Sequence, residues 1–142
     1  MGAIRDLQQR CGEAAAAKGF HDDRPKEMRT GSTLAGIAER NARLANWQGN
    51  KLMLIVSEVA EAQDELRKGH AANHTYYPTQ VVLHDPDRPE AIHKPEGVPS
   101  ELADTVIRVL DFCYTEGIDL ESIIDAKLSF NATRPKLHGR QF

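Results

Sequence analysis

The stretch KLMLIVSEVAEAQDELRKG, residues 51–69, decides the fold class, because its apolar and its acidic residues both recur at helical spacing. At about 100° per residue, Glu58, Glu61 and Glu65 fall within about 60° of one another on the helix surface. The adjoining arc is aliphatic and holds Leu52, Ile55, Val56, Val59 and Leu66. The acids therefore lie at the edge of the apolar face, whereas a solvated charge stripe usually lies opposite such a face.

A second acidic helix is expected in SELADTVIRVLDFCY, residues 100–114. One polar stripe on this helix is formed by Glu101, Asp104, Arg108 and Asp111. Apolar side chains cover most of the remaining surface, namely Leu102, Val106, Val109, Leu110 and Cys113. An apolar arc of this width predicts a helix that is buried on several sides, so its carboxylates cannot all turn to water.

Upstream of residue 51, the pattern predicts a helix over residues 3–18 and then a polar linker. Ser32 or Thr33 is expected to cap the helix that leads into the acidic stretch. Gly49 and the asparagine after it can kink or break that helix. Gly69 is expected to end it.

Between the two acidic helices, residues 70–99 hold five prolines, which excludes a long helix there. Residues 79–83 have the pattern of a short strand within an otherwise irregular loop. Ser100 is expected to cap the second acidic helix and Asp119 a last helix, which precedes a basic tail over residues 131–142. The sequence thus predicts an all-α fold, a bundle of four to five helices.

Composition narrows the class of protein. The chain has 142 residues, which favours a single domain over residues 1–142, with an N-terminal helix and linker over residues 1–33 and a core over residues 34–142. A net charge of -3 argues against stable nucleic-acid binding, and the two cysteines fit a reducing compartment. No apolar run approaches the roughly 20 residues that cross a bilayer, and no signal-peptide pattern opens the chain, so we expect a cytoplasmic protein.

The two acidic helices each carry a pair of carboxylates three residues apart, Glu58 with Glu61 and Glu101 with Asp104. If the helices pack antiparallel, about 8–10 Å apart, the pairs face each other and repel, and a divalent cation relieves that repulsion. Oxygen ligands favour Mg²⁺, or Mn²⁺, over zinc. The alternative is ordinary salt bridges, from Glu61 to Arg67 or Lys68 and from Asp104 to Arg108. The pattern alone leaves both readings open.

Residues 57–69, SEVAEAQDELRKG, and residues 94–142, KPEGVPSELADTVIRVLDFCYTEGIDLESIIDAKLSFNATRPKLHGRQF, resemble the MazG-like nucleoside triphosphate pyrophosphohydrolases, which are all-α. The family pattern of E-x-x-E followed by E-x-x-D maps to Glu58, Glu61, Glu101 and Asp104. The resemblance spans residues 34–142 and includes the tail motif that starts at Asn131. Two departures concern Ser57, where many members carry a glutamate, and the length of the loop over residues 70–99.

The resemblance implies Mg²⁺-dependent hydrolysis of a nucleoside triphosphate, a deoxynucleotide or a non-standard one, between its α and β phosphates. It implies that Glu58, Glu61, Glu101 and Asp104 are the metal-binding and catalytic residues, with Glu61 or Glu58 orienting or deprotonating the attacking water. It also implies a homodimer or homotetramer that completes the bundle. Two alternatives are a phosphoribosyl-ATP pyrophosphohydrolase-like enzyme and a non-catalytic helical module that binds metal or partners.

Binding of the phosphate groups of a nucleotide also requires cationic side chains. Lys127 and Arg134, with Asn131 as a polar contact, are candidates, although Arg134 can equally belong to a solvated tail. Lys51 lies two turns before Glu58 and is a further candidate. Trp47 either stacks on a nucleobase or anchors the core.

Overall fold

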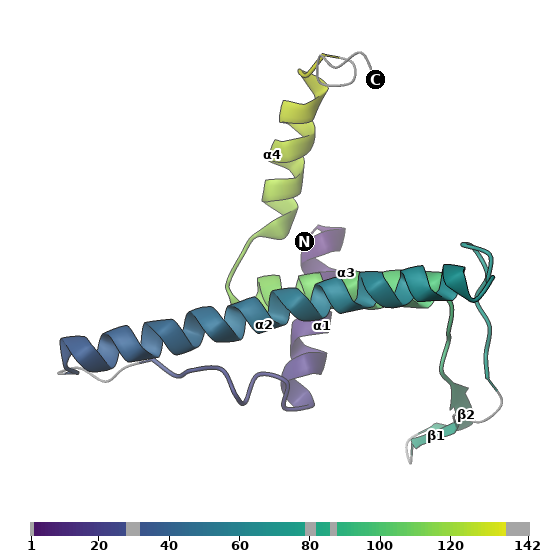
Figure 1. The fold of residues 1–142 in the computed structure, drawn as a ribbon, viewed down its shortest axis with the longest axis horizontal. Coiled ribbons are helices and arrows are strands. Elements are labelled where there is room, and N and C mark those ends of the chain that lie inside the picture. The colour runs from purple at the N-terminus through teal and green to yellow at the C-terminus, as the bar shows by residue number, and fades with distance from the viewer. Residues whose placement is uncertain (1, 28–31, 79–81, 86–87, 136–142) are drawn as a thin grey trace. The chain divides into compact units, whose positions relative to one another are not determined.

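The computed structural model describes residues 2–27, 32–78, 82–85 and 88–135, which form four helices and one small hairpin. The elements are α1 (Ala3–Ala17), α2 (Leu34–Arg67), β1 (Val82–Asp85), β2 (Arg88–His93), α3 (Val98–Thr115) and α4 (Leu120–Ala132), as Figure 1 shows. Helices dominate the described residues, which confirms the all-α class. None of the described helices combines the length and the apolar character that a bilayer span needs.

The chain divides into two compact units. The first comprises Met1–Asp22 and Leu110–Phe142, and the second comprises Asp23–Val109. The second unit contains α2, the hairpin and most of α3, and therefore all four acids of the two predicted pairs. The single domain expected over residues 1–142 stays a prediction.

Helix α2 is one continuous element of 34 residues. Thr33 caps it as predicted, because its side-chain oxygen accepts a hydrogen bond of 3.1 Å from the amide of Gly36. The break that Gly49 and Asn50 suggested is absent. A glycine costs a helix only about 1 kcal/mol relative to alanine, and the good helix formers on both sides outweigh that cost. The helix ends before Gly69, whose φ of 88° lies in the left-handed region.

Helix α3 begins at Val98, before the predicted cap. Ser100 lies inside the first turn, and its hydroxyl donates to the carbonyl of Pro95 over 2.9 Å. The chain enters the helix through Gly97, whose φ is 100°. A Cβ at this position would lie 2.5 Å from the carbonyl oxygen of His74, so only glycine fits. The prediction that Ser100 caps α3 is therefore wrong, because the helix starts at the turn formed by Gly97.

The segment between the acidic helices is more regular than expected. Strands β1 and β2 pair antiparallel, with Val82 opposite His93 and Asp85 opposite Arg88. An isolated bridge between Tyr76 and Glu96 closes the base of the segment. The predicted strand over residues 79–83 overlaps β1 at residues 82–83, and residues 79–81 lie outside the described part. The irregular loop expected over residues 70–99 therefore contains a hairpin.

In the first unit, α1 and α4 are joined by ion pairs near their N-terminal ends. Asp119 caps α4 as predicted and accepts a hydrogen bond of 3.2 Å from the amide of Ser122. Arg5 lies 2.9 Å from Asp119 and 3.2 Å from Glu121. Gly12 of α1 lies against the ring of Tyr114, where a Cβ would approach to 2.0 Å. This glycine allows the two segments to approach closely.

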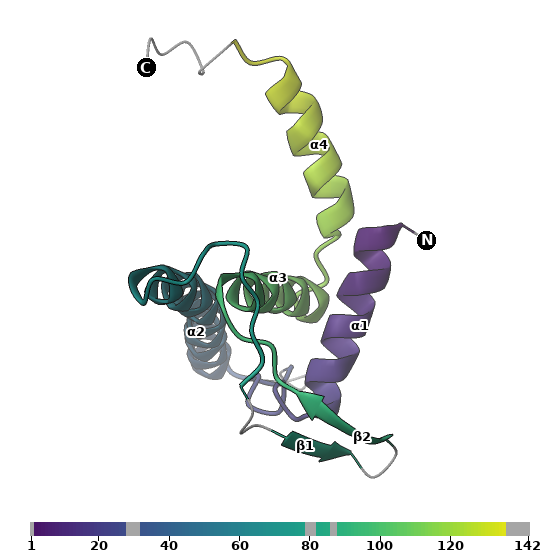
Figure 2. The ribbon, with the colours of Figure 1, turned by 90° about the vertical axis from the view of Figure 1, so that its right-hand side faces the viewer.

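In the second unit, α2 and α3 lie side by side and run in opposite directions (Figure 1 and Figure 2). Among the described residues of this unit, the buried apolar side chains are few, namely Trp47, Ala62 and Val98. The expected burial of α3 holds only in part for the chain as described: Leu110 and Cys113 are buried, whereas Leu102 is 49% and Val106 is 50% exposed. The part of its wide apolar arc that holds Leu102 and Val106 therefore stays open.

Candidate metal centre

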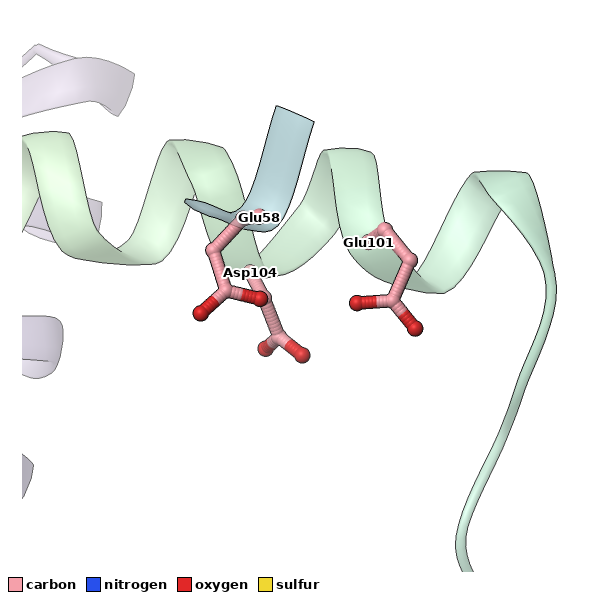
Figure 3. Close-up of side chains that lie close together, drawn as sticks. All are labelled: Glu58, Glu101 and Asp104. Carbon is pink, nitrogen blue, oxygen red and sulfur yellow. The ribbon is translucent and has the colours of Figure 1, made fainter. Parts of the chain in front are cut away.

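Three carboxylates converge between α2 and α3. Glu58 projects from α2, and Glu101 and Asp104 project from successive turns of α3, as Figure 3 shows. Each offers an oxygen, and these oxygens lie within 4.8 Å of one another. Glu58 is 5% and Glu101 is 7% exposed, and Asp104 is half-buried. A cluster of this kind could hold a metal ion.

The helical spacing explains the geometry of the cluster. Glu101 and Asp104 are three residues apart, which places both on one face of α3. The antiparallel course of α2 brings Glu58 to that same face, and in Figure 3 all three carboxyl groups extend to the same side of the helices. The acids lie on the inner edge of each helix, where the apolar arcs predicted them.

Glu61 is placed differently from the other three predicted acids. Its side chain is exposed on α2, and it is not one of the three residues whose oxygens meet within 4.8 Å. Its negative charge nevertheless helps to raise the pKa of Glu101. The prediction that four carboxylates converge therefore holds for three of them, with Glu61 at the exposed side of the cluster.

Burial and repulsion act together on Glu101. Burial is the larger cause that raises the pKa of its carboxyl group above the ordinary value, and the charges of Glu61, Asp104 and Glu58 raise it further. Lys94 opposes the shift. A cation bound among these oxygens would satisfy the charges that now repel, so the donor set and its electrostatics fit a divalent metal.

Arg108 already neutralises part of this charge. Its Nε donates to Oε1 of Glu58 over 2.5 Å. The alternative reading paired Arg108 with Asp104 on its own helix, but the guanidinium reaches across to α2 instead. This leaves the other oxygen of Glu58, together with Glu101 and Asp104, for a ligand.

The salt bridges that the alternative reading assigned to Glu61 go to other acids. Lys68 lies 2.6 Å from Glu65, and Arg67 lies 3.1 Å from Asp64. Glu65 also accepts hydrogen bonds from His70 and from Tyr76, over 2.6 and 3.1 Å. Hydrogen bonds from Lys68 and His70, and then from Tyr76, outweigh the desolvation of Glu65 and lower its pKa to about 2. Glu65 thus joins α2 to the segment that follows it.

Lys94 is a neighbour of the cluster that the sequence analysis did not single out. It follows β2, and its Nζ lies 2.8 Å from Glu96. Glu101 and Asp104 contribute to raising its pKa, after the larger effect of Glu96. The sequence feature that could have identified it is a single lysine shortly before the E-x-x-D motif. That lysine lies in a stretch that was expected to be an irregular loop. Lys94 lies near the acids because it is at the base of the hairpin, and no local sequence pattern predicts that position.

Trp47 and Lys51 lie together in the second unit. Trp47 is 7% exposed, and its indole nitrogen donates to Asp23 over 2.8 Å. The ammonium of Lys51 lies 5.0 Å and the guanidinium of Arg24 lies 5.8 Å from the centre of the indole ring. The burial matches the core-anchor role, and contact of either residue with a nucleotide stays a prediction.

The other predicted phosphate contacts belong to the first unit. Lys127 and Asn131 lie on α4 and Arg134 follows its end, and all three side chains are exposed. The charged ends of Lys127 and Arg134 lie 5.9 and 6.0 Å from the ring of Phe130. Their role toward a substrate stays a prediction, and residues 136–142 of the basic tail lie outside the described residues.

No family model, no curated protein and no solved structure matches this chain. The function of the chain is therefore inferred from the residues of the second unit and from the motif resemblance.

Proposed function

We propose that the chain is a Mg²⁺-dependent nucleoside triphosphate pyrophosphohydrolase of the MazG-like type. The observation that carries the proposal is the group formed by Glu58, Glu101 and Asp104, whose oxygens lie within 4.8 Å of one another. Three of the four acids of the family pattern are thus together in space. The proposed reaction is hydrolysis between the α and β phosphates, which yields a nucleoside monophosphate and pyrophosphate.

Glu58, Glu101 and Asp104 are the proposed metal ligands. An all-oxygen set of carboxylates suits a hard cation, so Mg²⁺ is the proposed ion and Mn²⁺ the proposed substitute. When bound, such an ion polarises phosphoryl oxygens and makes a bound water more acidic. A triphosphate is itself polyanionic, so an acidic site can receive it only with cations between the two.

Glu61 is the proposed general base. A base must reach the water while leaving its own lone pairs free to accept a proton. Glu58 accepts a hydrogen bond from Arg108 and is buried, whereas Glu61 is exposed at the edge of the cluster. These two observations favour Glu61 over Glu58 for orienting and deprotonating water.

Cations near the cluster would contact the phosphates. Lys94 is the proposed contact within the second unit, because its charge interacts with Glu101 and Asp104. Lys127, Asn131 and Arg134 are the further candidates from the first unit, and Trp47 and Lys51 are retained for the nucleoside. We propose deoxynucleotides or non-standard nucleotides as substrates, and a homodimer or homotetramer as the working form.

The ion pair between Arg108 and Glu58 favours a second candidate. A guanidinium that neutralises one of the three acids is also what a non-catalytic helix pair would use to stabilise itself. In that case the cluster would bind metal without turnover. Activity measurements separate the two candidates.

The test is a panel of ribo-, deoxyribo- and oxidised nucleoside triphosphates, with phosphoribosyl-ATP included, assayed for pyrophosphate with Mg²⁺. We expect release from at least one substrate and its loss in Asp104→Asn. The matched control is Asp64→Asn, which removes an exposed carboxylate of α2 that lies beside Arg67. Metal binding without product from any substrate would support the non-catalytic candidate and overturn the proposed enzyme.

A further inference from the structure

Helix α2 carries a second apolar line in addition to the face that packs on α3. Successive members are separated alternately by four and three residues, which is the repeat of a helix-pairing seam. We call this line the α2 seam. It has one polar member, Gln63, and consists of Ala38, Ala42, Ala45, Gly49, Leu52, Val56, Val59, Gln63 and Leu66. Every one of these residues is exposed.

The α2 seam lies well away from the acidic cluster. At about 100° per residue, its centre is roughly two fifths of a turn around the helix from Glu58. The aliphatic members are about half exposed: Leu52 is 48%, Val56 54% and Val59 49% exposed. An apolar line about 40 Å long is more than scattered surface hydrophobicity, and it indicates a binding surface.

Gly49 provides an independent indication of a close partner. Glycine is among the poorest helix formers, yet this one lies in the interior of a 34-residue helix. Within the described residues, no heavy atom lies within 4 Å of the Cβ that another residue would place there. The chain as described therefore gives no packing reason for a glycine. Close approach of another backbone or side chain would give one.

We propose that the α2 seam binds the α2 seam of a second copy of this chain in antiparallel orientation. The N-terminal half of the seam is small, with alanines and Gly49, and the C-terminal half is large, with leucine and valines. Antiparallel pairing places small residues against larger ones in the outer layers, and it pairs Leu52 with Val56 in the central layers. In the matching register Gly49 faces Val59, and Ala42 faces Leu66.

Charge supports the same orientation. Glu39 and Arg67 each follow an end of the seam by one residue, so they flank it on the same side. Antiparallel pairing brings Glu39 of one copy near Arg67 of the other at both ends. In a parallel pair, Glu39 of one copy and Arg67 of the other would lie at opposite ends of the seam, so this attraction would be absent. The Arg67 side chain is 70% exposed beside Asp64, which leaves its guanidinium accessible to a second carboxylate.

This inference does not depend on the proposed chemistry. It specifies which surface and which orientation would form a dimer, whereas the resemblance implies only that one forms. A different occupant, such as another helix of the same chain, would cover the seam in a monomer. A monomeric protein would therefore contradict the proposal.

The first experiment measures the mass of the full-length protein by sedimentation equilibrium. We expect a dimer for the wild type, or a tetramer built from such dimers. Gly49→Leu fills open space in the single chain and improves helix propensity, but it would collide with the second copy. We expect the dimer dissociation constant to rise at least about tenfold, with helical circular dichroism retained. Asn50→Leu is the control, because it adds the same side chain at an exposed position of α2 outside the seam, about 100° around the helix from Gly49.

The second experiment tests orientation by disulfide formation. Ala42→Cys and Leu66→Cys proteins are mixed and oxidised, and the linked peptides are identified by mass. We expect a disulfide between position 42 of one copy and position 66 of the other. A wild-type monomer, or a dimer that Gly49→Leu does not weaken, would overturn the proposed surface. Links from 42 to 42 and from 66 to 66 would overturn the antiparallel orientation.

Discussion

The pKa of the Glu101 carboxyl group depends both on its burial and on the charges of its neighbours. Glu101 is 7% exposed and shares its surroundings with Glu58, Asp104 and Glu61, and together these raise its pKa. A carboxylate in this position destabilises the folded chain when it is ionised without a counter-ion. The same carboxylate would become stabilising when a cation joins the cluster.

The first prediction concerns Glu101→Gln without metal. The folded pKa of Glu101 exceeds its unfolded value, so the wild-type chain loses stability as pH rises through the interval between them. Above that interval the variant lacks the penalty, and its free energy of unfolding should be higher by on the order of 1 kcal/mol. Urea denaturation at pH 7 with EDTA measures the difference. A variant that is clearly less stable under these conditions would show that the acids do not repel.

The second prediction concerns Glu61→Gln and rests on the proposed function. Removing a general base should lower kcat by about 10²–10⁴-fold, because the water then lacks its proton acceptor. Since Glu61 lies outside the three-residue cluster, Mg²⁺ affinity should change little. Steady-state kinetics and magnesium calorimetry on the same preparation measure both effects, with Asp64→Asn as the control. A wild-type kcat in Glu61→Gln would remove Glu61 from the mechanism.

At the scale of the element, local signals predicted the helices well. Thr33, Asp119 and Gly69 each act through neighbours within a few residues, and each was correctly assigned. The start of α3 was not, because it depends on Gly97 passing close to the carbonyl of His74. A contact between residues far apart in the sequence leaves no local pattern.

The same limit applies to the ion pairs of the acidic helices. Arg108 has Asp104 one turn away on its own helix, and the sequence favours that pair. The guanidinium instead bonds to Glu58 on α2, because the antiparallel packing of the two helices brings that carboxylate within reach. The spacing of residues along the sequence could therefore predict which faces of the two helices are acidic. It could not predict which acid is neutralised, nor that Glu61 lies at the exposed side.

The third prediction concerns the end of α2. Glu65 has a folded pKa of about 2, below the ordinary value of 4.5, so its hydrogen bonds stabilise the fold above that value. This contribution should be lost as pH falls from about 4.5 toward 2. Denaturation of wild type and Glu65→Gln over this range measures it. The wild type should be more stable at pH 7, and the two proteins should converge in acid.

The matched control for that comparison is Asp64→Asn. Asp64 is the preceding residue and forms an exposed pair with Arg67, and such pairs contribute at most about 1 kcal/mol. A stability gap between wild type and Glu65→Gln that stays constant down to pH 2 would contradict the low pKa. It would also remove the reason for regarding Glu65 as the link between α2 and the following segment.

At the scale of the whole molecule, the acidic cluster is contained in the second unit. Glu58, Glu101 and Asp104 all lie within Asp23–Val109. The basic candidates Lys127 and Arg134 belong to the first unit. A metal that binds the cluster therefore needs no residue from the first unit.

The fourth prediction is that Mg²⁺ stabilises the full chain. A ligand that binds only the folded state at a hundredfold excess over its dissociation constant adds about 2.7 kcal/mol. Thermal denaturation with and without Mg²⁺ should show a raised Tm for the wild type and for Asp64→Asn. Asp104→Asn should lose most of the shift. An equal shift in Asp104→Asn would show that the ion binds elsewhere.

The most direct test of the central claim follows the phosphorus atoms themselves. Wild-type protein, Mg²⁺ and the substrate found in the nucleotide panel are combined, and the products are observed by phosphorus NMR. We predict the signals of a nucleoside monophosphate and pyrophosphate, and their loss in Asp104→Asn. Signals of a nucleoside diphosphate and orthophosphate, or unchanged turnover in Asp104→Asn, would contradict the assignment of this cluster to cleavage between the α and β phosphates.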